Sequence, residues 1–196
     1  MANRIIDIAR SQDLTHEGTA DQGNFGVAPY VAYNGSANYS HRPAGALKAI
    51  NGLTCGGWFQ MTSNDFLMGA WQTAANQVWR LFVNGSAPTF YVSSTGANSF
   101  SVAAGNITAG QWYFVAARYT PSTELAIWLN DTKTVNTTNI PASLYDSASA
   151  NFSVGSDHGG SNLLTGKASM LWMSHEPLAD NLLTLLFQMS RHLYGV

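Results

Sequence analysis

The chain has 196 residues, of which 45% are hydrophobic but only 10% are charged, and its formal net charge is -2. This length suffices for one well-filled core, so we expect a single domain. Soluble domains ordinarily carry about 25% charged residues. A polar but weakly charged surface suits extensive protein–protein contact, where charges are depleted, or the neutral hydrogen bonding of sugars. A composition bias of the source organism would give the same numbers.

The composition also argues against two classes of partner. There are few lysines and no basic run that could follow a phosphate backbone, so nucleic acid is not an expected partner. The most apolar segment, Leu182–Phe187, is far shorter than the roughly 20 residues of a membrane span, so no membrane partner is expected. Met1–Arg10 lacks the long apolar run of a signal peptide.

Cys55 is the only cysteine, so it cannot form an internal disulfide or a zinc site built on several cysteines of this chain. Its apolar neighbours predict a buried, inert thiol. We therefore expect a chain made in a reducing compartment, or one that needs no disulfide.

Short apolar runs alternate with turn residues, a rhythm typical of a β-sandwich or jelly roll. The predicted strands are 30–33, 53–61, 66–70, 77–83, 89–94, 111–120, 124–129, 150–154 and 166–173. Turns such as Asn34-Gly35, Asn84-Gly85 and Thr120-Pro121-Ser122 separate them. We therefore predict an all-β fold, an antiparallel two-sheet jelly-roll sandwich.

One predicted strand differs from the others. Trp112–Tyr119 is apolar at nearly every position, which predicts a central strand buried on both faces and covered by loops or by another subunit. Glu124–Asn130 reads as the next strand of an antiparallel hairpin with a short turn.

The two ends of the chain read differently from the sandwich. Residues 1–25 are polar, and Ser11–Glu17 shows no strand period. We therefore interpret residues 1–25 as an arm, or as an edge strand followed by a loop. Such an arm needs something to hold it, and a neighbouring chain would do so. The sandwich is assigned to 26–196, including a C-terminal helix at about 178–192. The wide apolar face of this helix predicts that it is buried on the sandwich or that it forms a subunit interface.

Four ordered pieces together resemble the laminin G-like jelly-roll domains of the concanavalin A-like type. They are Tyr33-Asn34-Gly35-Ser36-Ala37-Asn38-Tyr39, Leu53-Thr54-Cys55-Gly56-Gly57-Trp58-Phe59, the Gly-x-Trp-x-x-Val-Ala hairpin of residues 110–130, and the closing segments 152–155, 164–168 and 178–180. The resemblance covers roughly residues 30–195. It implies the sandwich fold and leaves function open among lectins, adhesion modules, hydrolase accessories and virion components.

The sequence departs from this family in two places. Ser169 stands where the family often has an acidic residue, and Asn130-Asp131 replaces a frequent Asn-Gly. The first departure argues against carrying over the Ca²⁺ binding of some relatives. We therefore predict no cofactor and no metal residues, with Ca²⁺ lacking a clear ligand set.

Catalytic chemistry is not expected either. Sandwich glucanases use paired carboxylates about 5 Å apart. Glu17, Glu124 and Glu176 are far apart in the sequence, and no Glu-x-Asp-x-Glu run exists. We predict no catalytic residues and a protein that is not an enzyme.

The best candidate for ligand contact is the polar loop 155–162. Asp157 and Asn162 supply oxygens, His158 supplies a hydrogen-bonding ring, and the glycines admit a ligand to the backbone. Such a loop suits a sugar hydroxyl face or a hard cation such as Ca²⁺. A flexible hairpin loop explains the same residues.

Trp71 is the second candidate, because polar neighbours suggest partial exposure and its ring could stack on a sugar. A core position or a subunit contact is the alternative, and the stronger one.

Two functions follow. The first is a structural component of an assembly, most concretely a bacteriophage virion surface protein for head decoration or a fibre, made in the host cytoplasm. It predicts a homo-oligomer and other virion proteins as partners. The second is an extracellular carbohydrate-binding or adhesion module that binds glycans.

Overall fold

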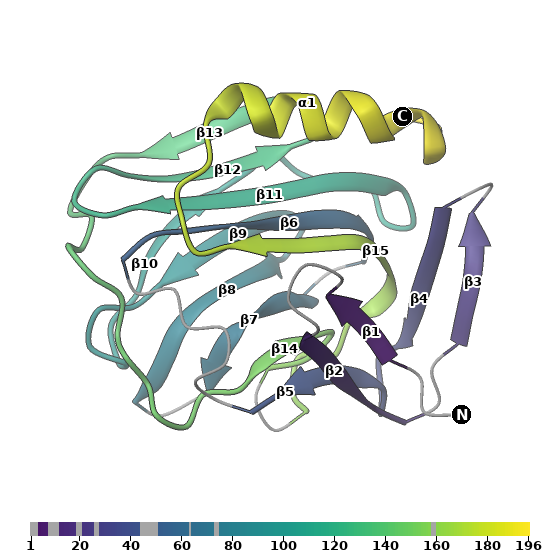
Figure 1. The fold of residues 1–196 in the computed structure, drawn as a ribbon, viewed down its shortest axis with the longest axis horizontal. Helices are drawn as coiled ribbons and strands as arrows, with labels where there is room; N and C mark the ends of the chain where they lie inside the picture. The colour runs from purple at the N-terminus through teal and green to yellow at the C-terminus, as the bar shows by residue number, and fades with distance from the viewer. Residues whose placement is uncertain are drawn as a thin grey trace.

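The computed structural model describes residues 4–7, 12–18, 21–25, 28–43, 51–62, 64–72, 75–157 and 160–196. They form two antiparallel sheets and one C-terminal helix (Figure 1). The elements are β1 (Arg4–Asp7), β2 (Gln12–Glu17), β3 (Asp21–Phe25), β4 (Ala28–Asn34), β5 (Tyr39–Arg42), β6 (Leu53–Gln60), β7 (Phe66–Gln72), β8 (Asn76–Asn84), β9 (Ala87–Val92), β10 (Phe100–Ala103), β11 (Trp112–Thr120), β12 (Glu124–Leu129), β13 (Thr132–Asn136), β14 (Phe152–Val154), β15 (Thr165–Ser174) and α1 (Asp180–Ser190), followed by a short 3-10 turn at Arg191–Leu193.

The order of strands is that of a sandwich whose connections cross between layers. Within the described residues, one sheet runs β1-β2-β5-β14-β7-β8-β9-β10 and the other β13-β12-β11-β6-β15-β4-β3. All the strand pairs are antiparallel, including the predicted hairpin of β11 and β12, which pairs Val115 with Leu129 and Thr120 with Glu124. The predicted two-sheet antiparallel sandwich with a C-terminal helix is therefore confirmed.

The N-terminal segments correct one expectation. Residues 12–17 form β2, although their polar sequence shows no strand period. β2 pairs with β1 and β5, and β3 pairs with β4, so hydrogen bonding to neighbouring strands sets their conformation. β1 and β3 each lie at a sheet edge, as the edge-strand alternative expects. The division of the chain at residue 26 stays a prediction.

Three short strands inside the sandwich were also missed, namely β5, β10 and β13. Each has four or five residues and is at most partly apolar, so its own sequence carries little strand signal. They form because longer strands beside them offer unpaired backbone groups.

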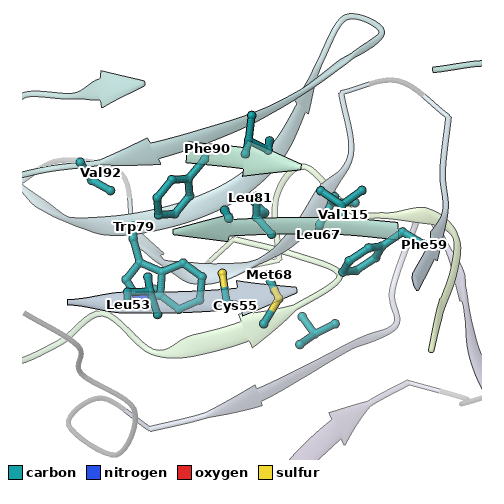
Figure 2. Close-up of a cluster of buried hydrophobic side chains, with 14 of the residues drawn as sticks. Leu53, Cys55, Phe59, Leu67, Met68, Trp79, Leu81, Phe90, Val92 and Val115 are labelled. Carbon is teal, nitrogen blue, oxygen red and sulfur yellow. The ribbon is translucent and has the colours of Figure 1, made fainter. Parts of the chain in front are cut away.

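The main core fills the space between the two sheets. Figure 2 shows side chains from β6 and β11 of one sheet meeting those from β7, β8 and β9 of the other. The labelled members are Leu53, Cys55, Phe59, Leu67, Met68, Trp79, Leu81, Phe90, Val92 and Val115. All of them are almost fully buried.

A second core lies on the outer face of the β6–β11 sheet, under α1 (Figure 1). Leu183 and Phe187 of the helix are buried there. Trp58 stacks on Tyr194 with ring centroids 4.3 Å apart. The Trp58 Nε1 donates a hydrogen bond to Ser190 Oγ at 2.8 Å. The prediction that residues 112–119 form a central strand buried on both faces is confirmed, and α1 supplies the cover in place of a loop or another subunit.

An ion-pair network holds the first turn of α1 to the sheet. Arg118 pairs with Glu124, and its Nη1 lies 2.6 Å from Asp180 Oδ1. Lys133 Nζ lies 2.9 Å from Asp180 Oδ2. Burial, the largest influence, raises the pKa of Asp180, but hydrogen bonds and charge from Lys133 and Arg118 outweigh it and hold that pKa below its ordinary value. None of the helices in the described part of the chain is long and apolar enough to cross a membrane.

The buried position of Cys55 makes its thiol unreactive in the folded protein. Its side chain is fully buried, and this burial raises the pKa of the thiol above its ordinary value. We expect an aromatic disulfide reagent to leave Cys55 unmodified in the native protein and to react with it completely in denaturant, because the thiolate is the nucleophile. Fast native labelling, followed by absorbance, would contradict this burial.

The Asp180 ion pairs predict a pH-dependent contribution to stability. A carboxyl with a lowered pKa stabilises the fold above its unfolded pKa of about 4, and this contribution is lost as the pH falls through the folded value. The Asp180 side chain is 53% exposed. Asp180→Asn should therefore lower the free energy of unfolding at pH 7 by only about 0.5 kcal/mol.

Urea unfolding at neutral and acid pH measures this difference. The gap between wild type and Asp180→Asn should shrink below about pH 4. Asp131→Asn is the matched control, because Asp131 is exposed in the β12–β13 turn. A gap that stays constant into acid would show that the ion pairs do not cause the effect.

Candidate functional site

Arg80 and three aromatic rings form the first feature that stands out, and we call Arg80, Trp71, Phe82 and Tyr91 the Arg80 cluster. Neighbours Trp79 and Leu81 belong to the core between the sheets, so alternation along β8 places Arg80 and Phe82 on the outer face. The guanidinium carbon lies 4.5 Å from the ring centroid of Trp71 and 4.6 Å from those of Phe82 and Tyr91. Three cation–π contacts thus fix one side chain.

The charge of Arg80 is incompletely compensated. Among the described residues its Nε is buried without an acceptor, and no carboxylate lies within ion-pair distance of the guanidinium. Burial, the largest influence, lowers the pKa of Arg80, and its electrostatic interactions with the Tyr91 phenol and the Asp157 carboxylate act in the opposite direction. The side chain as a whole remains partly exposed. In the described part of the chain the buried Nε therefore has no acceptor, and the terminal N–H groups form no ion pair.

Trp71 lies in this cluster, and its expected partial exposure is wrong. The side chain is 4% exposed and packs with Phe66 and Phe82, with Tyr91 edge-on at 6.2 Å between centroids. Arg80 covers it further. The ring has no free face for stacking on a sugar, so the alternative of a core position is confirmed.

Asp157 is buried, and its carboxylate is used within its own loop. The residue is 2% exposed, its Oδ1 accepts from the backbone N–H of Ser161 at 2.8 Å, and its Oδ2 accepts from the Asn162 amide at 2.9 Å. These bonds give Asp157 a structural role in a hairpin loop. His158 lies outside the described residues. Asn162 is exposed. Ligand binding by Asp157, His158 and Asn162 stays a prediction.

Two of the predicted site residues thus interact with Arg80: its guanidinium lies over the Trp71 ring, and the Asp157 carboxylate acts on its pKa. The sequence analysis did not identify Arg80. A lone arginine within the apolar run 77–83 carries no motif. The usable signal was its place in strand alternation, on the same face as the aromatic Phe82. The rings of Trp71 and Tyr91 come from neighbouring strands, and their alignment needs the sheet register.

Among the described residues Glu124 and Asp180 approach each other, and both carboxylates form ion pairs with Arg118 and Lys133. Glu17 on β2 pairs with His41 at 3.1 Å, whereas Glu124 on β12 belongs to the other sheet and to the Arg118 network. No group of three or more His, Cys, Asp or Glu side chains that could hold a metal is found among the residues searched. Ser169, which replaces the acidic residue frequent in the family, bonds Tyr194 at 2.5 Å.

The second feature is a row of exposed apolar side chains on α1, which we call the α1 stripe. Leu182, Leu185 and Met189 are 38%, 50% and 66% exposed. Their spacing of three and four residues places them along one side of the helix, away from the buried Leu183 and Phe187. The helix is apolar toward the sheet and apolar toward solvent.

Comparison with known structures shows what this architecture is similar to. The binding domain of Paraclostridial Mosquitocidal Protein 1 superposes with a TM-score of 0.72 at 9% identity over 97% of this chain and 52% of that one. The receptor binding domain of botulinum neurotoxin C/D mosaic serotype gives 0.72 at 8% identity over 94% and 48%. The botulinum neurotoxin serotype G binding domain gives 0.70 at 10% identity over 93% and 48%.

At these identities the similarity shows the fold alone, and the chain spans about half the length of those solved chains. A comparison with curated protein sequences found no match. The sequence model of the concanavalin A-like lectin/glucanases superfamily, of the laminin G type, matches residues 34–181. Because this match covers well over half of the chain, the protein belongs to the concanavalin A-like lectin/glucanase superfamily.

Proposed function

We propose that this protein is a non-catalytic binding module that acts by assembly with other protein chains. The observation that carries the proposal is the α1 stripe. A helix that packs on its own sheet needs one apolar face, and α1 already buries Leu183 and Phe187 there. A second apolar face toward water lowers solubility unless it is covered.

The composition supports the same surface use. Interface centres are depleted in charged residues, and only 10% of this chain is charged. The exposed residues Thr184 and Gln188 beside the α1 stripe are uncharged as well. A second copy of the chain fits this helix best, because a two-fold axis would set stripe against stripe without placing like charges opposite each other.

The most concrete form of this assembly is a surface component of a bacteriophage virion, as a head decoration or fibre protein. The support is the sequence: very low charge, a single buried cysteine and many neutral polar residues suit a protein made in a reducing cytoplasm that works outside it. In that setting the partners are further copies of this chain and other virion proteins.

Light scattering after size-exclusion chromatography tests the assembly. We expect wild type to elute as a homo-oligomer, and Leu185→Lys with Met189→Lys to elute as a monomer, because two charges would stand in the apolar contact. Thr184→Lys with Gln188→Lys adds the same charge on the polar side of α1 and should stay oligomeric. Thermal unfolding checks that all three proteins are folded.

A wild-type protein that stays monomeric at high concentration would contradict the proposal. So would a control pair that dissociates the oligomer as fully as the Leu185 and Met189 changes, since the effect would then be one of charge alone.

Carbohydrate binding is the second candidate, and membership of a superfamily that includes lectins favours it. The burial of Trp71 and the internal bonding of Asp157 weigh against sugar contact at these two of the four candidate residues. On a glycan array we therefore expect no reproducible hits among neutral glycans from the wild-type protein. Hits that the Leu185→Lys, Met189→Lys variant retains would favour the carbohydrate function over assembly.

A further inference from the structure

We propose that Arg80 is a binding site for the carboxylate group of an acidic ligand on the outer face of the eight-stranded sheet. This site is independent of the assembly through α1, because the helix lies on the other sheet. Among the described residues Arg80 and Arg118 both lie against aromatic rings, and the fold gives them different partners.

Arg118 shows how the fold neutralises the charge of such a cation. Its guanidinium carbon lies 5.1 Å from the ring centroid of Trp128, and Glu124 and Asp180 neutralise it. Its Nη1 also donates to the Leu178 carbonyl at 2.5 Å. Ring contacts and carboxylates act together there, as charge-assisted hydrogen bonds to a guanidinium ordinarily do.

Arg80 has the rings without the carboxylates. Three rings lie around its guanidinium, and among the residues that the structure describes no carboxylate forms an ion pair with it. Its Nε is buried without an acceptor, as is the Nε of Arg118, so the two arginines differ in the partners of their terminal N–H groups. The carboxylate of Asp157 acts on the pKa of Arg80. Its two oxygens, however, accept hydrogen bonds from Ser161 and Asn162, and the residue is only 2% exposed. The carboxylates that neutralise Arg118 have no counterpart at Arg80 among the described residues, and a ligand carboxylate would supply one.

The geometry prepares Arg80 for this role. Cation–π contact uses the face of the guanidinium and leaves the N–H groups on its edge for hydrogen bonds. Gly69 on β7 lets β8 approach closely at Arg80, because a Cβ there would lie 2.5 Å from the Trp79 carbonyl oxygen and 2.7 Å from Arg80 Cα. A side chain held in place in advance loses little conformational entropy on binding.

Polar groups adjoin the cluster. The Asn84 amide donates to the Tyr91 hydroxyl at 3.2 Å, and Asn84 is exposed. A small ligand with hydroxyl groups beside its carboxylate would meet both a cation and neutral hydrogen-bonding groups, so a uronic acid is a suitable probe.

The first test uses the wild-type protein alone. In nitrogen-15 NMR, the Nε–Hε signal of Arg80 should shift saturably with glucuronate, with a dissociation constant near 1 mM, a value typical of a weak single contact. Glucose, which lacks the carboxylate, should leave the signal in place. An Arg80 signal that glucuronate at about 10 mM does not move overturns the proposal. Sulfate binding as tight as glucuronate overturns the carboxylate preference.

Variants then connect binding to the side chain. Arg80→Gln should weaken glucuronate at least about tenfold, and Arg80→Lys should weaken it less, because lysine keeps the charge without the planar fork. Arg191→Gln removes an exposed arginine at the end of α1 and should bind like wild type. Equal losses in Arg80→Gln and Arg191→Gln would contradict a specific site. The wild-type signal decides the matter if Arg80→Gln does not fold.

Discussion

The burial of β6 and β11 on both faces is the constraint on which the rest of this structure depends. Their inward side chains, such as Cys55 and Val115, meet the opposite sheet, and their outward ones, such as Trp58 and Phe114, lie under α1. Each large apolar side chain buried in this way contributes about 1.5–3 kcal/mol. A sandwich normally leaves its outer faces to water, so this sheet needs its helix, and the helix position follows from that need.

The same requirement determines which surfaces remain for partners. One side of α1 is occupied by the sheet, and the Arg118 network fixes where the helix begins. What remains outward is the α1 stripe, whose apolar side chains the fold itself does not use. On the opposite sheet three rings contact the Arg80 guanidinium, whose Nε has no acceptor in the described part of the chain. The protein therefore presents a row of exposed apolar side chains on one layer and a partly exposed arginine on the other.

Sequence alone predicted the parts whose signal is local. The apolar run of 112–119 and the tight turn after it define β11 and β12, and the C-terminal helix follows from its leucines. The polar β2 could not be found, because its conformation comes from pairing with β5, residues it meets only in the fold. Trp71 was misjudged for a related reason. Its polar sequence neighbours say nothing about Arg80 and Tyr91, which strand register brings against it.

The residues that cover the outer face of β6 and β11 come from the far end of the chain, which has a consequence for how the protein is made. Trp58 bonds a serine 132 residues further along the chain, and Tyr194 completes the stack over its ring. During synthesis, β6 and β11 emerge well before the residues that shield their outer face. For that interval the nascent sheet presents tryptophan and phenylalanine rings to its surroundings, where they invite aggregation. Loss of α1 and the residues after it would leave this outer face uncovered in the finished protein, because Leu183, Phe187 and Tyr194 form its cover.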